Sequence, residues 1–153
     1  MKLNTRVRYA IRMMADIAKT GAEGPVPLKG VADRQGLSKL YLSQLATPLR
    51  NAGLLKSVWG NKGGYILGRP AGQINLLEIM EAVDGPLSII ECVAAPGSCE
   101  RAAFCETIDV WRDINTAVTR VLERYTLQHL TDMAPRAGEP GMACFPSRSL
   151  SQT

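Results

Sequence analysis

The chain has 153 residues, of which 46% are hydrophobic and 21% charged, and its formal net charge is +4. This composition can bury a core, which argues against wholesale disorder, and the length suits one domain or a small domain with an added oligomerisation element. The sequence has no signal-peptide core and no apolar run of the roughly 18 residues that a membrane span needs, so we expect a cytoplasmic protein without a membrane partner.

Most of the positive charge lies in the N-terminal half. Residues 1–69 hold twelve Lys or Arg and three acids, whereas residues 70–153 hold six basic residues and eleven acids. Two solvated surfaces would account for this split, but it also fits an N-terminal half that binds a polyanion. The motifs of that half favour the second interpretation.

An amphipathic helix is predicted at the N-terminus. Asn4 or Thr5 is placed to cap it, and Gly21 lies where it should end. A second, shorter helix is expected from Leu28 to about Gln35. The apolar residues of the first helix recur at steps of four, three and four; they are Val7, Ile11, Met14 and Ala18.

The sequence Gly36-Leu37-Ser38 predicts the turn of a helix-turn-helix. Glycine permits a tight turn, Leu37 enters the core and Ser38 caps the next helix. That helix is expected over residues 39–52, with Pro48 bending it after Ala46 or displacing its last turn. Its polar face is rich in donors and holds no acid, which is typical of a helix that reads DNA. The residues expected to contact DNA here are Ser38, Lys39, Tyr41, Ser43, Gln44, Thr47 and Arg50.

A β-hairpin is predicted directly after this helix. Two short apolar strands, residues 54–59 and 65–67, flank a glycine-rich turn over residues 60–64. A nucleotide-phosphate loop is disfavoured because neither a helix start nor a Lys-Ser/Thr pair follows the glycines. A hairpin at this place is a wing, whose basic tip enters a minor groove or holds phosphate. The wing residues expected to contact DNA are Trp59, Lys62, Gly63 and Gly64.

The predicted fold is therefore mainly α with a small β wing. Residues 1–69 are expected to form a winged helix-turn-helix domain that binds double-stranded DNA. Residues 70–133 are expected to hold a cysteine loop and a dimerisation helix. Residues 134–153, which are rich in Pro, Gly and Ser, are expected to be a disordered tail.

A long amphipathic helix is predicted from Glu106 to about Met133, after a short helix over residues 76–83 and a loop. Pairing with a second copy would bury its apolar stripe and place two recognition helices about one DNA turn apart. Packing within one chain is the alternative. The stripe comprises Trp111, Ile114, Val118, Leu122 and Tyr125.

Three of the four cysteines lie within fourteen residues. Cys92, Cys99 and Cys105 are separated by six and five residues, and Pro96-Gly97 lets the loop turn so that the thiols meet. Soft thiolates select zinc, copper(I) or iron–sulfur clusters, although the spacing matches neither zinc-ribbon pairs nor ferredoxin runs. Metal or cluster binding is the favoured interpretation, and buried or redox-active thiols are the alternative. Cys144, in the tail, is expected to be a bystander.

Together these motifs resemble the Rrf2 family of bacterial winged-helix regulators over about residues 1–133. The resemblance implies a homodimer that binds operator DNA and holds an iron–sulfur cluster, with 2Fe–2S favoured and 4Fe–4S the alternative. It assigns the cluster to Cys92, Cys99 and Cys105. The other residues that carry it are Met1-Lys2-Leu3-Asn4-Thr5, Arg8-Tyr9-Ala10, Gly24-Pro25-Val26-Pro27-Leu28, Gln35-Gly36-Leu37-Ser38, Tyr41-Leu42, Gln44-Leu45, Arg50, Gly53-Leu54, Gly63-Gly64-Tyr65 and Trp111-Arg112-Asp113.

The chain departs from the cluster-holding members of this family at the fourth ligand. Where those members place a histidine three residues after the last cysteine, this chain has Ile108, which cannot bind iron. Glu106 and Asp109 are the candidates for this ligand, with Glu91, a water, a small thiol or His129 as alternatives. His129 is too far along a continuous helix to reach the loop of its own chain, so it is expected to be an ordinary helix residue.

The predicted DNA-reading residues depart from the family as well. Ser43 stands where a cluster-holding relative has a glutamate, and Trp59 where it has an arginine. Trp59 is expected to be either an apolar wedge or a core residue, and the operator is expected to differ from the familiar one.

The leading hypothesis is a dimeric transcriptional regulator that senses redox, oxygen, nitric oxide or iron status through an iron–sulfur cluster. The alternative is a DNA-binding regulator switched by cysteine oxidation or by direct metal binding without a cluster. An enzyme is disfavoured because the sequence shows no nucleophile–base arrangement and has one histidine. A cluster carrier would not explain the basic N-terminal half.

Overall fold

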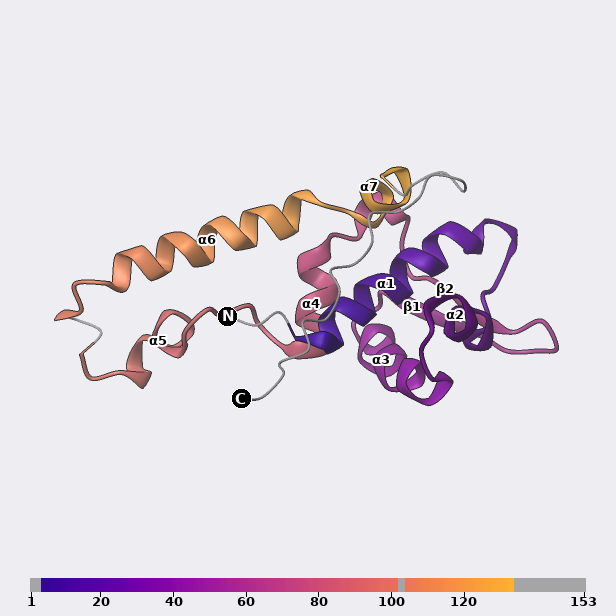
Figure 1. Cartoon of the computed structure of the whole chain (residues 1–153), viewed down its shortest axis with the longest axis horizontal. Helices are drawn as coiled ribbons and strands as arrows, with labels where there is room; N and C mark the ends of the chain where they lie inside the picture. Colours follow the sequence, from indigo (N-terminus) through magenta and orange to yellow (C-terminus); the bar gives the residue numbers. More distant parts are fainter. Residues whose placement is uncertain (1–3, 102–103, 134–153) are drawn as a thin grey trace, which may run out of the picture.

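The computed structural model describes residues 4–101 and 104–133. It is mainly helical with one two-stranded antiparallel sheet, as predicted (Figure 1). Short 3-10 helices lie at Gly21–Glu23, Ala71–Gln73 and Pro96–Ser98. The main elements in chain order are α1 (Thr5–Thr20), α2 (Leu28–Gln35), α3 (Lys39–Asn51), β1 (Leu55–Val58), β2 (Gly64–Leu67), α4 (Leu76–Asp84), α5 (Glu91–Ala94), α6 (Ile108–Arg124) and α7 (Leu127–Asp132).

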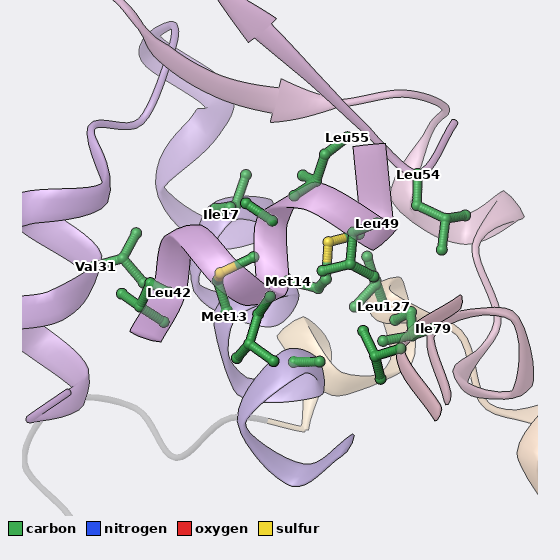
Figure 2. Packing of buried hydrophobic residues seen from close by; sticks show 14 of the residues in the cluster. Met13, Met14, Ile17, Val31, Leu42, Leu49, Leu54, Leu55, Ile79 and Leu127 are labelled. Carbon is green, nitrogen blue, oxygen red and sulfur yellow. The ribbon is translucent and has the colours of Figure 1, made fainter. Parts of the chain in front are cut away.

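Helix α1 is the centre of the folded body and packs against α2, α3, α4 and α7. One cluster of buried apolar side chains joins these helices to the wing; the labelled members include Met13 and Met14 of α1, Leu42 of α3, Ile79 of α4 and Leu127 of α7 (Figure 2). All five are fully buried. Since the cluster draws on both sides of residue 69, it ties α4 and α7 to the winged half, and the division after residue 69 stays a prediction.

Local capping sets the ends of the helices in the helix-turn-helix. The Asn4 side chain accepts a hydrogen bond from the Arg6 amide at 3.0 Å, which confirms the predicted cap of α1. Gly36 adopts a left-handed conformation with φ 65°, the turn geometry for which glycine was expected. Ser38 caps α3 by accepting from the Tyr41 amide at 3.1 Å. Helix α3 then continues through Pro48 to Asn51, so the proline does not end it early.

The wing is anchored to the start of α2 by backbone hydrogen bonds. β1 and β2 pair in antiparallel register from Leu55 opposite Leu67 to Val58 opposite Gly64. Val26 and Tyr65 exchange both backbone hydrogen bonds at 2.9 Å, which fixes the hairpin beside the helix-turn-helix. The wing position is thus set by the sheet and by this additional bridge.

The single helix predicted over residues 106–133 is wrong: α6 ends at Arg124 and α7 begins at Leu127. Tyr125 is extended, and its carbonyl accepts from the Leu76 amide at 2.9 Å, while the Leu127 amide donates to Ile74 at 3.0 Å. These bonds to the segment before α4, together with the complete burial of Leu127, outweigh continuation of the helix. Within residues 4–101 and 104–133, no helix is long and apolar enough to cross a bilayer.

Candidate nucleic-acid interface and cysteine loop

Helix α3 presents a polar face opposite its core face. Leu42, Leu45, Ala46 and Leu49 are buried, which fixes the helix against α1 and leaves the opposite side in solvent. At steps of four, three and four, one row of exposed residues runs along that side; it comprises Leu40, Gln44, Thr47 and Asn51. We call this row the α3 outer face.

The expected DNA-contacting residues of α3 lie in different surroundings. Lys39, Gln44, Thr47 and Arg50 are exposed, whereas Tyr41 and Ser43 are half-buried. Thr47 also donates to the Ser43 carbonyl at 3.1 Å.

Two residues expected to contact DNA also have structural partners. Ser38 accepts from the Tyr41 amide, so its oxygen is engaged in capping α3. The Tyr41 ring meets the Tyr9 ring edge-on with centroids 5.9 Å apart. Neither contact removes the hydroxyl proton, which remains the donor that each side chain offers.

The wing carries one large exposed aromatic side chain. Trp59 is 92% exposed, so of its two expected roles, apolar wedge or core residue, the second is wrong. Lys62 is exposed near it. The glycines of the turn have a steric role: a Cβ on Gly64 would lie 2.5 Å from the Val26 carbonyl, and one on Gly63 would lie 2.5 Å from the Val58 oxygen. Any DNA contact by these two glycines therefore comes in addition to close backbone packing.

A groove of about 300 Å³ lies between the starts of α2 and α3 and the wing. Two lysines, Lys29 and Lys39, line it together with Ser43 and the backbone of Gly63 and Gly64. Lys29 could not be predicted from the sequence, because nothing local shows that the first turn of α2 comes beside the wing. Two ammonium groups at one groove favour a phosphate backbone.

A network of polar contacts holds α1, α2 and α3 in place. Asp16, 7% exposed, accepts hydrogen bonds from Arg34 and from Gln35. Gln35 in turn accepts from Arg12, whose guanidinium lies 5.5 Å from the centroid of the Tyr9 ring. The hydrogen bond and attraction of Asp16 raise the pKa of Arg34. This network ends at Tyr9, which contacts Tyr41, so it connects α1 and α2 to α3.

The three loop cysteines are free thiols on separate short segments. Cys92 lies on α5, Cys99 follows the 3-10 helix, and Cys105 lies three residues before the first residue of α6. In the described residues, no three His, Cys, Asp or Glu side chains are gathered so that they could hold a metal ion. The donors thus have the right chemistry for a thiophilic metal or cluster, but the loop does not assemble them. Cys144 lies outside the described residues.

Cys105 is the thiol whose surroundings favour the thiolate. Its sulfur lies 3.3 Å from the Thr107 hydroxyl, and this hydrogen bond, with the Thr107 amide, lowers the pKa of the Cys105 thiol. The Ile108 amide and the charge of Arg101 act in the same direction. The thiolate is the form that binds metals and reacts with oxidants.

The candidates for a fourth ligand differ in availability. Glu106 is exposed, and Asp109 is exposed but bonds Arg112 at 3.2 Å. Ile108 is buried, 7% exposed, which suits a packing role. His129 lies on α7, where its Nδ1 accepts from the Thr126 amide at 3.1 Å in a capping box. His129 is therefore a structural residue, as expected.

Helix α6 exposes apolar side chains along its length. It packs against α4 and α5 on one side, and Leu122 contacts the core cluster. Asn115 accepts from the Ile89 amide at 3.1 Å, which ties the segment before α5 to the middle of α6. On another side of α6, four apolar side chains are 37% to 56% exposed. We call these residues the α6 stripe; they are Val110, Trp111, Ile114 and Val121. Figure 1 shows α6 extending away from the body around α1.

The family model that matches this chain is Rrf2, described as an iron-dependent transcriptional regulator, over residues 3–133. Among curated relatives, the HTH-type transcriptional regulator IscR of Xenorhabdus nematophila is 42% identical over 130 residues, covering 85% of this chain and 79% of the relative. IscR of Cronobacter sakazakii is 41% identical over 132 residues, covering 86% of this chain and 81% of the relative.

Solved structures agree with this family. CymR (YrzC), the global cysteine regulator of B. subtilis, matches with a TM-score of 0.75 and 38% identity, over 88% of this chain and 99% of that one. IscR of T. potens matches with a TM-score of 0.74 and 36% identity, over 92% and 93% of the two chains. The winged helix-turn-helix arrangement described above is therefore shared with these proteins.

Proposed function

This chain belongs to the Rrf2 family of transcriptional regulators, and from that premise we propose that it is a homodimer whose binding to operator DNA depends on an iron–sulfur cluster. Its family is one of DNA-binding regulators, not of enzymes. The observation that carries the DNA-binding part is the pairing of the α3 outer face with the lysine-lined groove beside the wing. The recognition helix would enter the major groove while the wing meets the minor groove or the backbone.

The dimer is proposed from the α6 stripe. Four large apolar side chains exposed along one helix are costly in a monomer, and a second copy of the same helix would cover them. A symmetric pair would also present two recognition helices to one operator.

Cys92, Cys99 and Cys105 would hold the cluster, with Glu106 or Asp109 as the candidate fourth ligand. When bound, the cluster supplies a group that responds to redox poise, oxygen, nitric oxide or iron supply. Because the three thiols lie on separate segments, binding by all three requires the loop to rearrange. That rearrangement would move α6, a helix that packs against α4, and α4 packs on α1 and α3. A change in the cysteine loop would therefore be transmitted to α3, the proposed recognition helix, through helices that pack against one another.

The names of the relatives support two different switches. The Rrf2 description is iron-dependent, and IscR relatives cover most of the chain. CymR of B. subtilis is described as a global cysteine regulator, and CymR of Staphylococcus aureus has been solved in an oxidized form. The alternative proposal is therefore a thiol or direct metal switch, and the observation that favours it is that the three cysteines are free thiols, with the Cys105 sulfur hydrogen-bonded to the Thr107 hydroxyl at 3.3 Å.

Anaerobic purification, followed by an absorption spectrum and iron and sulfide analysis, tests the cluster. We expect near-stoichiometric iron and sulfide that are lost in Cys92→Ser, Cys99→Ser and Cys105→Ser and kept in the control Cys144→Ser. A colourless protein that resists anaerobic reconstitution would overturn the cluster proposal. DNA binding that then changes on oxidation with diamide would establish the thiol switch instead.

A further inference from the structure

Leu40 is an exposed apolar residue on a face that is otherwise polar. It lies in the first turn of α3 and is 72% exposed. Its side chain shares the α3 outer face with Gln44 and Thr47, four and seven residues later. Helix periodicity therefore places Leu40 on the side of α3 directly opposite the buried Leu42, Leu45 and Leu49, where it has no role in the core.

The neighbours of Leu40 on α3 are residues that can bind DNA. Lys39 beside it lines the groove that runs to the wing, and Gln44 offers an amide one turn further along the helix. The N-terminal residues of a recognition helix are the ones that contact base edges in the major groove. Among those edges, thymine alone presents a methyl group, and apolar side chains are what recognise it.

We propose that Leu40 determines operator specificity by packing against a thymine methyl group in the major groove. This inference rests on the proposed DNA-binding function. Leucine has no hydrogen-bonding group, so it discriminates through apolar contact alone: it favours a methyl-bearing edge and leaves the exposed amino group of cytosine unsatisfied. Gln44 would read an adjacent base by hydrogen bonds, and Lys39 would hold the phosphate backbone near it.

The test begins with selection of bound sequences from random double-stranded DNA by the full-length protein, both as purified anaerobically and after chelator treatment. Each thymine of the selected operator is then replaced by deoxyuridine, which removes only the methyl group. Fluorescence anisotropy measures the affinity of the wild type, Leu40→Ala and Lys62→Ala for each DNA. Circular dichroism checks that the variants are folded, as expected for substitutions at exposed positions.

We expect one thymine in each half-site whose replacement weakens wild-type binding by about fourfold, the value of burying one methyl group. Leu40→Ala, which changes both subunits, should bind the thymine operator about as weakly as the wild type binds an operator with uracil in both half-sites, and should not distinguish thymine from uracil at that position. Lys62→Ala should lose affinity for both DNAs while keeping the wild-type ratio between them.

Two results would overturn the role of Leu40 while leaving DNA binding intact: no thymine at which uracil weakens wild-type binding, or a uracil penalty that persists in Leu40→Ala. Failure to enrich any sequence in either state of the protein would instead refute the proposed DNA-binding function, and this inference with it.

Discussion

Arg34 on α2 donates hydrogen bonds to both carboxylate oxygens of Asp16 on α1. Its Nε donates to the two oxygens at 3.1 Å each, and Nη2 donates to Oδ2 at 2.7 Å. Asp16 is 7% exposed, whereas the Arg34 side chain is 43% exposed. The buried Asp16 carboxylate therefore depends on the more exposed Arg34 guanidinium for most of its hydrogen bonds.

This asymmetry predicts unequal losses on mutation. Arg34→Ala leaves a buried carboxylate held only by Gln35 and should lower the free energy of unfolding by about 2–3 kcal/mol. Asp16→Ala lets the half-exposed guanidinium turn to water and should cost about 1–2 kcal/mol. Urea denaturation of both variants and of the double variant measures these values. The double variant should be no less stable than Arg34→Ala; a larger loss would contradict the account.

The wing anchor depends on the absence of a side chain at Gly64. Alanine there would place Cβ 2.5 Å from the Val26 carbonyl and break its bridge to Tyr65. We expect Gly64→Ala to destabilise the fold by about 1–3 kcal/mol and to weaken operator binding. Gly72→Ala is the matched control, because its nearest neighbour is an ordinary 3.9 Å away. Equal melting temperatures for the two variants would refute the steric explanation.

The sequence predicted most of the winged half because its signals are local. Asn4, Ser38 and Gly36 each act on residues within one turn, so caps and helix limits followed from spacing. The break between α6 and α7 could not be predicted because it depends on hydrogen bonds that pair residue 125 with residue 76 and residue 127 with residue 74, about fifty positions earlier.

The candidate site was predicted in part for the same reason. Donor-rich residues of α3 could be recognised from their spacing, but Lys29 lines the groove only because the Val26–Tyr65 bridge holds the start of α2 beside the wing. Leu40 could not be predicted as a DNA-contacting residue because it is apolar, and only its 72% exposure on the α3 outer face distinguishes it from a core leucine. Spacing alone placed the cysteines in one loop but gave no indication of how that loop folds.

Trp59 should matter for binding and not for folding. Since it is 92% exposed, Trp59→Ala should leave the melting temperature unchanged. If the indole wedges against bases or sugars of the minor groove, its loss should weaken operator binding by about tenfold, the scale of one aromatic contact with a base. Anisotropy titrations measure this loss, with Trp59→Phe expected to keep most of the affinity. Undiminished binding by Trp59→Ala would show that the indole does not contact DNA.

Charge on the α6 stripe should prevent dimerisation. Ile114→Glu or Val121→Glu would place a carboxylate in the proposed interface, where burial of an unpaired charge is costly, and should raise the dimer dissociation constant by about a hundredfold or more. Thr116→Glu, on a different exposed side of α6, is the control. Light scattering after gel filtration distinguishes the species. A dimer that survives both stripe substitutions would place the interface elsewhere.

The lysines of the groove should determine how binding depends on salt. Each phosphate neutralised by a lysine contributes about one unit to the slope of log affinity against log salt, hence about two units in a symmetric dimer. Lys29→Ala and Lys39→Ala should each reduce the slope by that amount and weaken all DNA sequences alike. Arg120→Ala, on α6 and outside the groove, should leave the slope unchanged. Titrations at several potassium chloride concentrations provide the measurement. An unaltered slope for Lys29→Ala would mean that the backbone does not pass between α2 and the wing.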